Sequence, residues 1–165
     1  MSELGIYLND HLAGSTVGVE LAKRAAGANE GNEYGAELAG IAVEIEEDRD
    51  ALRTLLDELS IGEDQLKIGM AWLGEKLGRL KPNGSLLSYT PLSRLIELEG
   101  LFLGVNGKRA LWLNVRASIG AKVKSVDLTD LIARAESQSE RLEAMRGKAA
   151  AEALSPPAGS AGSGD

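Results

Sequence analysis

Residues 38–59, LAGIAVEIEEDRDALRTLLDEL, carry an apolar stripe that a long α-helix presents on one side. The members of the stripe are Leu38, Ile41, Ile45, Leu52, Leu55 and Leu59. They follow one another at intervals of three and four residues with a single gap, and this spacing is typical of one helix face. Asp48 stands in the gap, where the stripe requires another apolar side chain. A carboxylate at that position predicts a helical bundle with a polar group in its core.

Four further ranges show helical periodicity. They are residues 5–28, 62–80, 91–118 and 127–154, and the central helix extends over 34–59. A short stretch rich in Gly and Asn, residues 27–35, separates the first two helices, so we expect them to be antiparallel neighbours. Thr90 followed by Pro91 predicts the start of the fourth helix, and Asp127 or Thr129 predicts the cap of the last.

The range 91–118 has an unusually wide apolar face. Its main stripe is Leu95, Leu98, Phe102, Val105 and Trp112, and the residues beside it are Leu92, Ile96, Leu103, Ala110 and Leu113. This width predicts a central helix that is covered on most sides. Glycine pairs four residues apart recur at Gly14 and Gly18, Gly74 and Gly78, and Gly100 and Gly104. The pairs predict close approach of neighbouring helices.

Composition restricts the class of protein further. The 165 residues suffice for one bundle domain over 1–154, and the Pro/Gly/Ser-rich range 155–165 is expected to be a disordered tail. There is no Cys, which excludes disulfides and thiolate metal sites. The net charge of −7 argues against a nucleic-acid partner. No signal peptide and no run long enough to span a membrane is visible, so we expect a cytoplasmic protein.

Two stretches of the sequence resemble the ferritin-like superfamily. IAVEIEEDRDALRTLLDEL is similar to the second bundle helix of that superfamily, and LIELEGLFLGVNGKRALW is similar to the third. The chain also resembles small ferritin-like proteins of actinobacteria. The resemblance implies an all-α, up-down four-helix bundle with a crossover between its second and third helices. Residues 62–80 would then be an extra, shorter helix inside the crossover.

The same resemblance implies candidate metal ligands, because di-iron members of the superfamily place carboxylates from all four helices around iron or manganese. The candidates are Glu20 in the first helix, Glu44 and Asp48 in the second, Glu99 or its neighbour Glu97 in 91–118, and Glu136 or Glu140 in the last. The two histidines of the superfamily are missing here. The sequence therefore favours a bundle without a metal or other cofactor, in which the acids pair with Arg49, Arg109 or Lys108.

His11 is the only histidine and follows Asp10. A single histidine can serve as a metal ligand, a general base or a pH switch, and it can equally be a hydrogen-bonded structural residue. No nucleophile motif accompanies it, so a hydrolase is not predicted.

Three functions follow from these patterns. The first, which the sequence favours, is a non-catalytic bundle that acts through association or scaffolding, as a homodimer or with another protein. The second is a carboxylate-rich di-metal protein with an oxidase or metal-handling role. The third is a small-ligand pocket between helices at the glycine pairs. Converging carboxylates would support the second function, ion pairs from the same acids the first, and an apolar cavity at the glycines the third.

Overall fold

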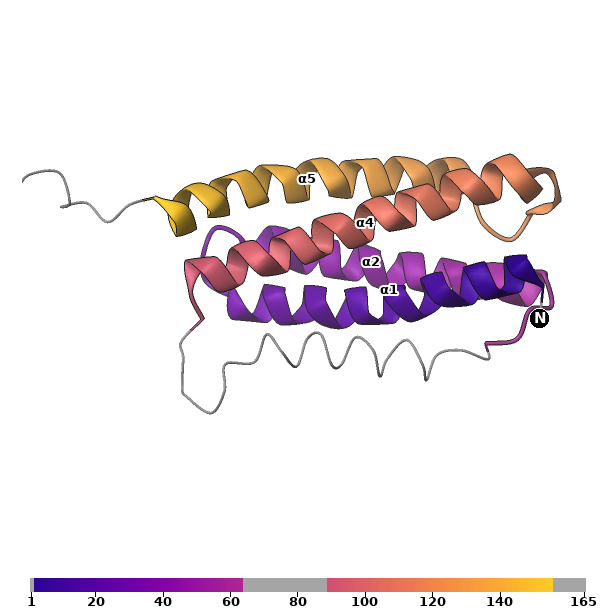
Figure 1. The fold of residues 1–165 in the computed structure, drawn as a ribbon, viewed down its shortest axis with the longest axis horizontal. Coiled ribbons are helices and arrows are strands. Elements are labelled where there is room, and N and C mark those ends of the chain that lie inside the picture. Colours follow the sequence, from indigo (N-terminus) through magenta and orange to yellow (C-terminus); the bar gives the residue numbers. More distant parts are fainter. Residues whose placement is uncertain (1, 64–88, 156–165) are drawn as a thin grey trace, which may run out of the picture.

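The computed structural model describes residues 2–63 and 89–155, and within these ranges the chain is helical, without strands. Its long helices are α1 (Glu3–Ala28), α2 (Gly35–Glu58), α4 (Pro91–Ile119) and α5 (Leu128–Leu154), and the short 3-10 helix η1 (Gly120–Lys122) follows α4 (Figure 1). These elements confirm the predicted all-α class. The expected crossover helix and the expected C-terminal tail fall largely outside the described residues.

The helices form two antiparallel hairpins. α1 lies beside α2 and α4, and α5 lies beside α4. Side-chain pairs join α5 to α2 in antiparallel order, from Arg134 with Glu47 to Arg141 with Glu37. Since both α2 and α4 run opposite to α1, they run in the same direction (Figure 1).

The chain leaves α2 and enters α4 at opposite ends of the bundle. Near the start of α1, the Asn9 side-chain amide donates to the backbone oxygen of Gly62 at 3.1 Å. Near the end of α1, the Asn29 amide donates to the Tyr89 hydroxyl at 2.8 Å. The end of α2 and the start of α4 therefore lie almost the full length of α1 apart.

Local sequence signals fix the ends of the helices. Thr90 caps α4 through a capping box with Ser93, and Pro91 occupies the first turn. Asp127 caps α5 by accepting from the backbone N–H groups of Thr129 and Asp130. Of the two predicted caps, Asp127 and Thr129, the structure therefore has Asp127. Gly35 begins α2 where an added Cβ would lie 2.4 Å from the Asn29 backbone oxygen.

The core consists of two apolar clusters. Toward the end of α1 the members include Ala22, Leu38, Leu98 and Leu142, and toward its start they include Leu12, Leu55, Trp112 and Leu131. Asp48 and Gln138 are also buried, Asp48 between the cluster positions Ile45 and Leu52 of α2. The predicted seam of α2 is thus buried from Leu38 to Leu55, including its carboxylate, and Leu59 at its end is half-buried.

The prediction that α4 is covered on most sides is wrong. Leu92, Ile96 and Leu103 are exposed, with Leu103 at 70%. Among the described elements α4 packs mainly against α1 and α5, with η1 at its end and the Lys108 side chain reaching Asp48 of α2, and these three side chains are left exposed. The predicted main stripe is buried at Leu95, Leu98, Val105 and Trp112, and Phe102 is half-buried. The other buried positions of α4 are Glu97, Leu101, Leu111 and Val115.

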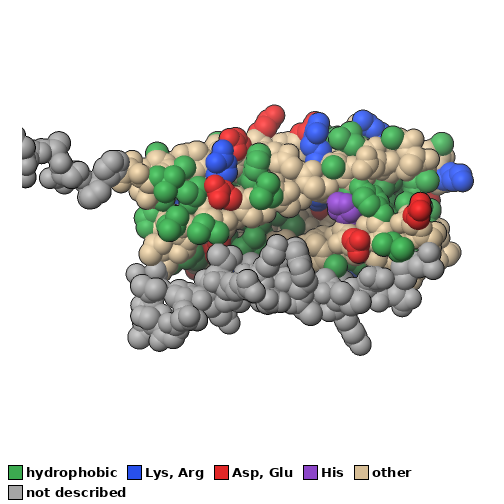
Figure 2. All heavy atoms as spheres, viewed as in Figure 1, with side chains coloured by type: hydrophobic (Ala, Val, Ile, Leu, Met, Phe, Trp, Pro, Cys, Tyr) green, Lys and Arg blue, Asp and Glu red, His purple; other side chains and the backbone are tan. Residues whose placement is uncertain are grey.

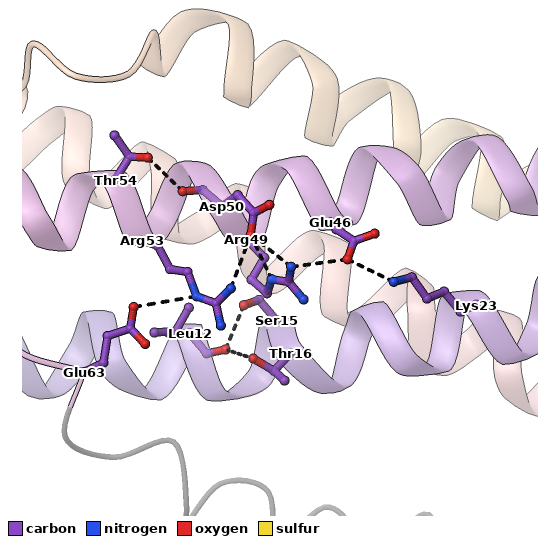
Figure 3. A network of polar contacts seen from close by, with 10 residues as sticks. All are labelled: Leu12, Ser15, Thr16, Lys23, Glu46, Arg49, Asp50, Arg53, Thr54 and Glu63. Carbon is purple, nitrogen blue, oxygen red and sulfur yellow. Dashed lines mark hydrogen bonds and ion pairs between the residues drawn. The ribbon is translucent and has the colours of Figure 1, made fainter.

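A surface network of charged side chains joins α1 to α2 (Figure 3). Lys23 on α1 contacts Glu46 on α2 at 2.9 Å, and Arg49 contacts the same carboxylate at 3.3 Å. These pairs are exposed or half-buried and contribute little stability each. Across residues 2–63 and 89–155, no helix has both the length and the apolar character that crossing a bilayer requires.

Candidate functional site

Asp48 is the centre of a buried polar layer between α2, α4 and α5. Its Oδ2 accepts from the Lys108 ammonium and, at 3.2 Å, from the side-chain amide of Gln138. Its Oδ1 forms an ion pair with an Arg134 guanidinium nitrogen at 2.7 Å. The Asp48 side chain is fully buried, and buried carboxylates are tolerated in proteins when they are paired in this way.

Gln138 links Asp48 to a second carboxylate. Its side-chain amide also donates to Glu44 at 3.0 Å, and its amide oxygen accepts from Lys108. Arg141 donates to the same Glu44 oxygen and, at 3.0 Å, to Glu37. The layer therefore neutralises its acids with cations from α4 and α5.

Burial and pairing shift the pKa values in this layer in opposite senses. Burial lowers the pKa of Lys108, and the neighbouring Asp48 carboxylate offsets part of this effect. Burial alone would raise the pKa of Glu44, but hydrogen bonds from Arg141 and Gln138 and the charge of Arg141 outweigh it and hold that pKa below 4.5.

The structure brings together two of the four residues predicted as metal ligands. Glu44 and Asp48 share Gln138, whereas Glu20 and Glu99 are exposed. Of the two alternatives offered for α4, Glu97 is the buried one, and it pairs with Arg24 at 2.9 Å and accepts from Tyr89. Of the pairing residues predicted, Lys108 pairs with Asp48, and Arg109 pairs with the candidate Glu136 at the surface. Arg49 contacts Glu46 and Asp50, which were not among the candidate acids.

The four acids do not fit a di-metal centre in this arrangement. Among the described residues, no three His, Asp or Glu side chains lie close enough to hold a metal ion. Both oxygens of Asp48 already contact cations. Metal binding by Glu20, Glu44, Asp48 and Glu99 stays a prediction of the sequence.

Sequence reasoning missed Arg134, Gln138 and Arg141. They follow one another at intervals of four and three residues and so lie on one face of α5, the face that the structure turns toward α2. Gln138 occupies a seam position just as Asp48 does, seven residues after Leu131 and four before Leu142. A polar residue at a seam position in each of two helices was the sequence signal that could have indicated their contact.

A cavity of about 330 Å³ adjoins the polar layer between α1 and α4, with α2 at its floor. Figure 2 shows the surface hollowed on this side, beside the purple side chain of the single histidine. Its walls are mainly apolar and include five glycines, Gly14, Gly18, Gly100, Gly104 and Gly107.

An added Cβ would meet no atom within 4 Å at Gly14, Gly104 or Gly107. The prediction of close helix approach is therefore wrong at Gly14 and Gly104, which border open space instead.

His11 lies at this cavity and is half-buried. The Tyr7 ring meets the imidazole edge-on, with ring centres 4.7 Å apart. Burial lowers the pKa of His11 below 6.5, and the charge of Asp10 counteracts only part of that effect. The imidazole is thus favoured in its neutral form.

Comparisons with protein-family models, with curated proteins and with solved structures gave no match. The class of protein is therefore defined by the fold and the site alone. In the part of the chain described here, it is an all-α protein of four long helices with a buried, charge-paired layer and an adjoining cavity.

Proposed function

We propose that this chain is a ferritin-like helical bundle that acts through association with a second protein molecule, without catalysis and without a metal centre. The observation that carries the proposal is the pairing of Asp48 with Lys108 and Arg134. Cations occupy the positions around this carboxylate that metal ions would otherwise have to take. The buried acid then needs no metal to compensate its charge.

The order of the helices supports the ferritin-like arrangement. α2 and α4 run in the same direction, and α2 ends at the opposite end of the bundle from the start of α4, as a crossover between second and third helices requires. A short antiparallel hairpin on either side of that connection completes the pattern.

The outer side of α4 supports association. Leu92, Ile96 and Leu103 lie at intervals of four and seven residues, so they share one side of the helix, and they are 49%, 37% and 70% exposed. Apolar side chains gathered on one side favour a protein interface over free solvent. A second copy of this chain is the partner that we propose.

Sedimentation of the full chain over a range of concentrations tests association. We expect a reversible dimer that Leu103→Glu converts to monomer, because a charge in the interface stays unpaired. Val43→Glu, at an exposed apolar position of α2, is the matched control and should leave the dimer intact. A monomer at every concentration contradicts the proposed homodimer.

Metal loading separates the proposal from its alternative, an iron- or manganese-binding carboxylate protein with an oxidase or metal-handling role. After anaerobic incubation with ferrous iron or manganous ion and gel filtration, we expect no stoichiometric metal on the chain. One or two tightly held ions per chain that Asp48→Ala removes would establish the alternative and overturn the metal-free proposal.

A further inference from the structure

The cavity between α1 and α4 has a polar end and an apolar end. Because the two helices are antiparallel, His11 and Ser15 of α1 share one end with Lys108 and Trp112 of α4. At the other end, an added Cβ on Gly100 would lie 3.2 Å from Leu21, so the helices come together there and close the cavity.

Between these ends the walls are apolar. The side chains are Leu21, Ile45, Leu52, Leu101, Val105 and Leu111. The lining residues of α1 run from Asp10 to Leu21, a length of about 16 Å at 1.5 Å per residue. The volume of about 330 Å³ lies in the range of small-molecule sites. The space therefore suits an elongated, mainly apolar molecule.

The polar end offers hydrogen-bond donors. Trp112 is fully buried, and its indole N–H has no acceptor among the described residues. The Lys108 ammonium has three hydrogens and donates to Asp48 and Gln138, which leaves one. The indole nitrogen has almost no accessible surface, so the remaining Lys108 hydrogen is the donor that an acceptor from outside the chain would meet.

We propose that this cavity binds a single-chain amphiphile of the fatty-acid type, with its alkyl chain toward Leu21 and Gly100 and its carboxylate at Lys108, beside Trp112. Asp48 does not repel such a head group strongly, because Lys108 and Arg134 neutralise it. The glycines leave room for the chain, since side chains at Gly14, Gly104 and Gly107 would extend into open space.

Calorimetric titration of the full chain with dodecanoate, below its micelle concentration, tests the site. We expect saturable binding of one molecule per chain. Dodecyltrimethylammonium has the same alkyl chain and a head group that accepts no hydrogen bond, so it should bind at least about tenfold more weakly. Equal binding of both probes overturns the assigned head-group contacts, and no saturable binding of dodecanoate overturns the site.

Two variants fill the cavity from opposite walls. Gly18→Leu starts from a Cβ at an ordinary 3.8 Å from Ile45, and Gly104→Leu starts from open space, so neither requires the backbone to move. Each should weaken dodecanoate binding about tenfold or more without lowering the melting temperature. Gly147→Leu is the matched control, because this helical glycine of α5 is exposed, has open space around it and lies outside the cavity. Undiminished binding in both cavity variants contradicts the proposal.

The indole N–H signals of the two tryptophans give a second readout. The resonance of Trp112, identified by its loss in Trp112→Phe, should shift when dodecanoate binds, because the carboxylate then lies beside the indole. An unchanged Trp112 resonance at saturation places the head group elsewhere and contradicts the assignment.

Discussion

At the scale of single residues, Asp48 and Lys108 each depend on the other. Both are removed from solvent, with side-chain exposures of 0% and 12%. Taking either charge out of water is unfavourable, and their mutual attraction together with the contacts from Gln138 and Arg134 offsets that cost. Removing Asp48 therefore leaves Lys108 without its buried anion, whereas removing Lys108 leaves Asp48 with Arg134 as its remaining cation.

We expect Asp48→Leu to lower the free energy of unfolding by about 3–5 kcal/mol, since Lys108 would lose its buried anion. Urea unfolding followed by circular dichroism measures the change. Asp50→Asn is the control, because Asp50 is exposed, and it should alter stability by less than about 0.5 kcal/mol. A more stable Asp48→Leu protein would mean that the carboxylate is only a tolerated charge in an apolar seam.

The double variant Asp48→Leu with Lys108→Met removes both charges. Apolar side chains of similar volume often replace a buried ion pair without loss, so the double variant should recover much of the stability. If it is as unstable as the sum of the single variants, the two residues act independently and the pairing argument fails.

At the scale of the helices, two glycines, Gly35 in α2 and Gly147 in α5, differ in whether a side chain would fit. Gly35 begins α2 against the backbone of Asn29, which is itself buried and accepts from Arg94 at 2.6 Å. Gly147 lies inside α5 with open space around it. The first glycine is required by a close contact, and the second only weakens its helix.

We therefore expect opposite effects from the same substitution. Gly35→Ala should lower stability by about 1–3 kcal/mol, because the Cβ forces a tightly held backbone to move. Gly147→Ala should raise stability by about 0.5–1 kcal/mol through helix propensity alone. Thermal and urea unfolding of both variants measure the difference, and two changes of the same sign would be inconsistent with the contact at Gly35.

The sequence predicts the helices well because their signals are local. The cap residues Thr90 and Asp127 each act within three positions of themselves. The outcome for α4 was different, because Leu103 and Leu101 are both apolar and only the neighbouring helices decide which one is buried. Burial around a wide apolar face depends on long-range packing, which a pattern within one helix does not contain.

At the scale of the whole molecule, charged side chains carry much of the contact between α2 and α5. Arg134 contacts Glu47 and Asp48, and Arg141 contacts Glu37 and Glu44. An interface of this kind depends on ionised carboxylates, and it is therefore sensitive to acid.

We expect Glu44 to contribute to that sensitivity. Its pKa is lower in the fold than its ordinary value of 4.5, so the unfolded chain binds more protons between the two values. The stabilisation is present above pH 4.5 and is lost as the pH falls through the pKa of the folded state. Unfolding of Glu44→Gln between pH 7 and 3 should show a smaller loss of stability than the unmodified protein.

Glu30→Gln, at an exposed position of the loop after α1, is the control for this comparison. It should follow the unmodified protein over the whole pH range. Parallel curves for Glu44→Gln and the unmodified protein would show that the contacts of Glu44 with Arg141 and Gln138 add no stability.

The candidate site could be predicted only in part. Asp48 was evident because a carboxylate interrupts an apolar stripe, which is a pattern within one helix. Its partners Arg134 and Gln138 come from α5, about ninety residues later, and depend on how far α5 is rotated and shifted along α2. The cavity was predicted only as one alternative, since glycine spacing is the same whether a helix packs against it or space is left there.

The glycine-lined cavity also determines how this protein should respond to selection in the laboratory. Glycine within a helix is destabilising relative to alanine, so Gly14, Gly104 and Gly107, which border open space, are sites where thermal selection alone finds improvement readily. Selection that also demands ligand retention should keep them. The sequences obtained under the two kinds of selection should therefore differ first at these three glycines. That difference would distinguish positions that limit thermal stability from positions that are needed for binding.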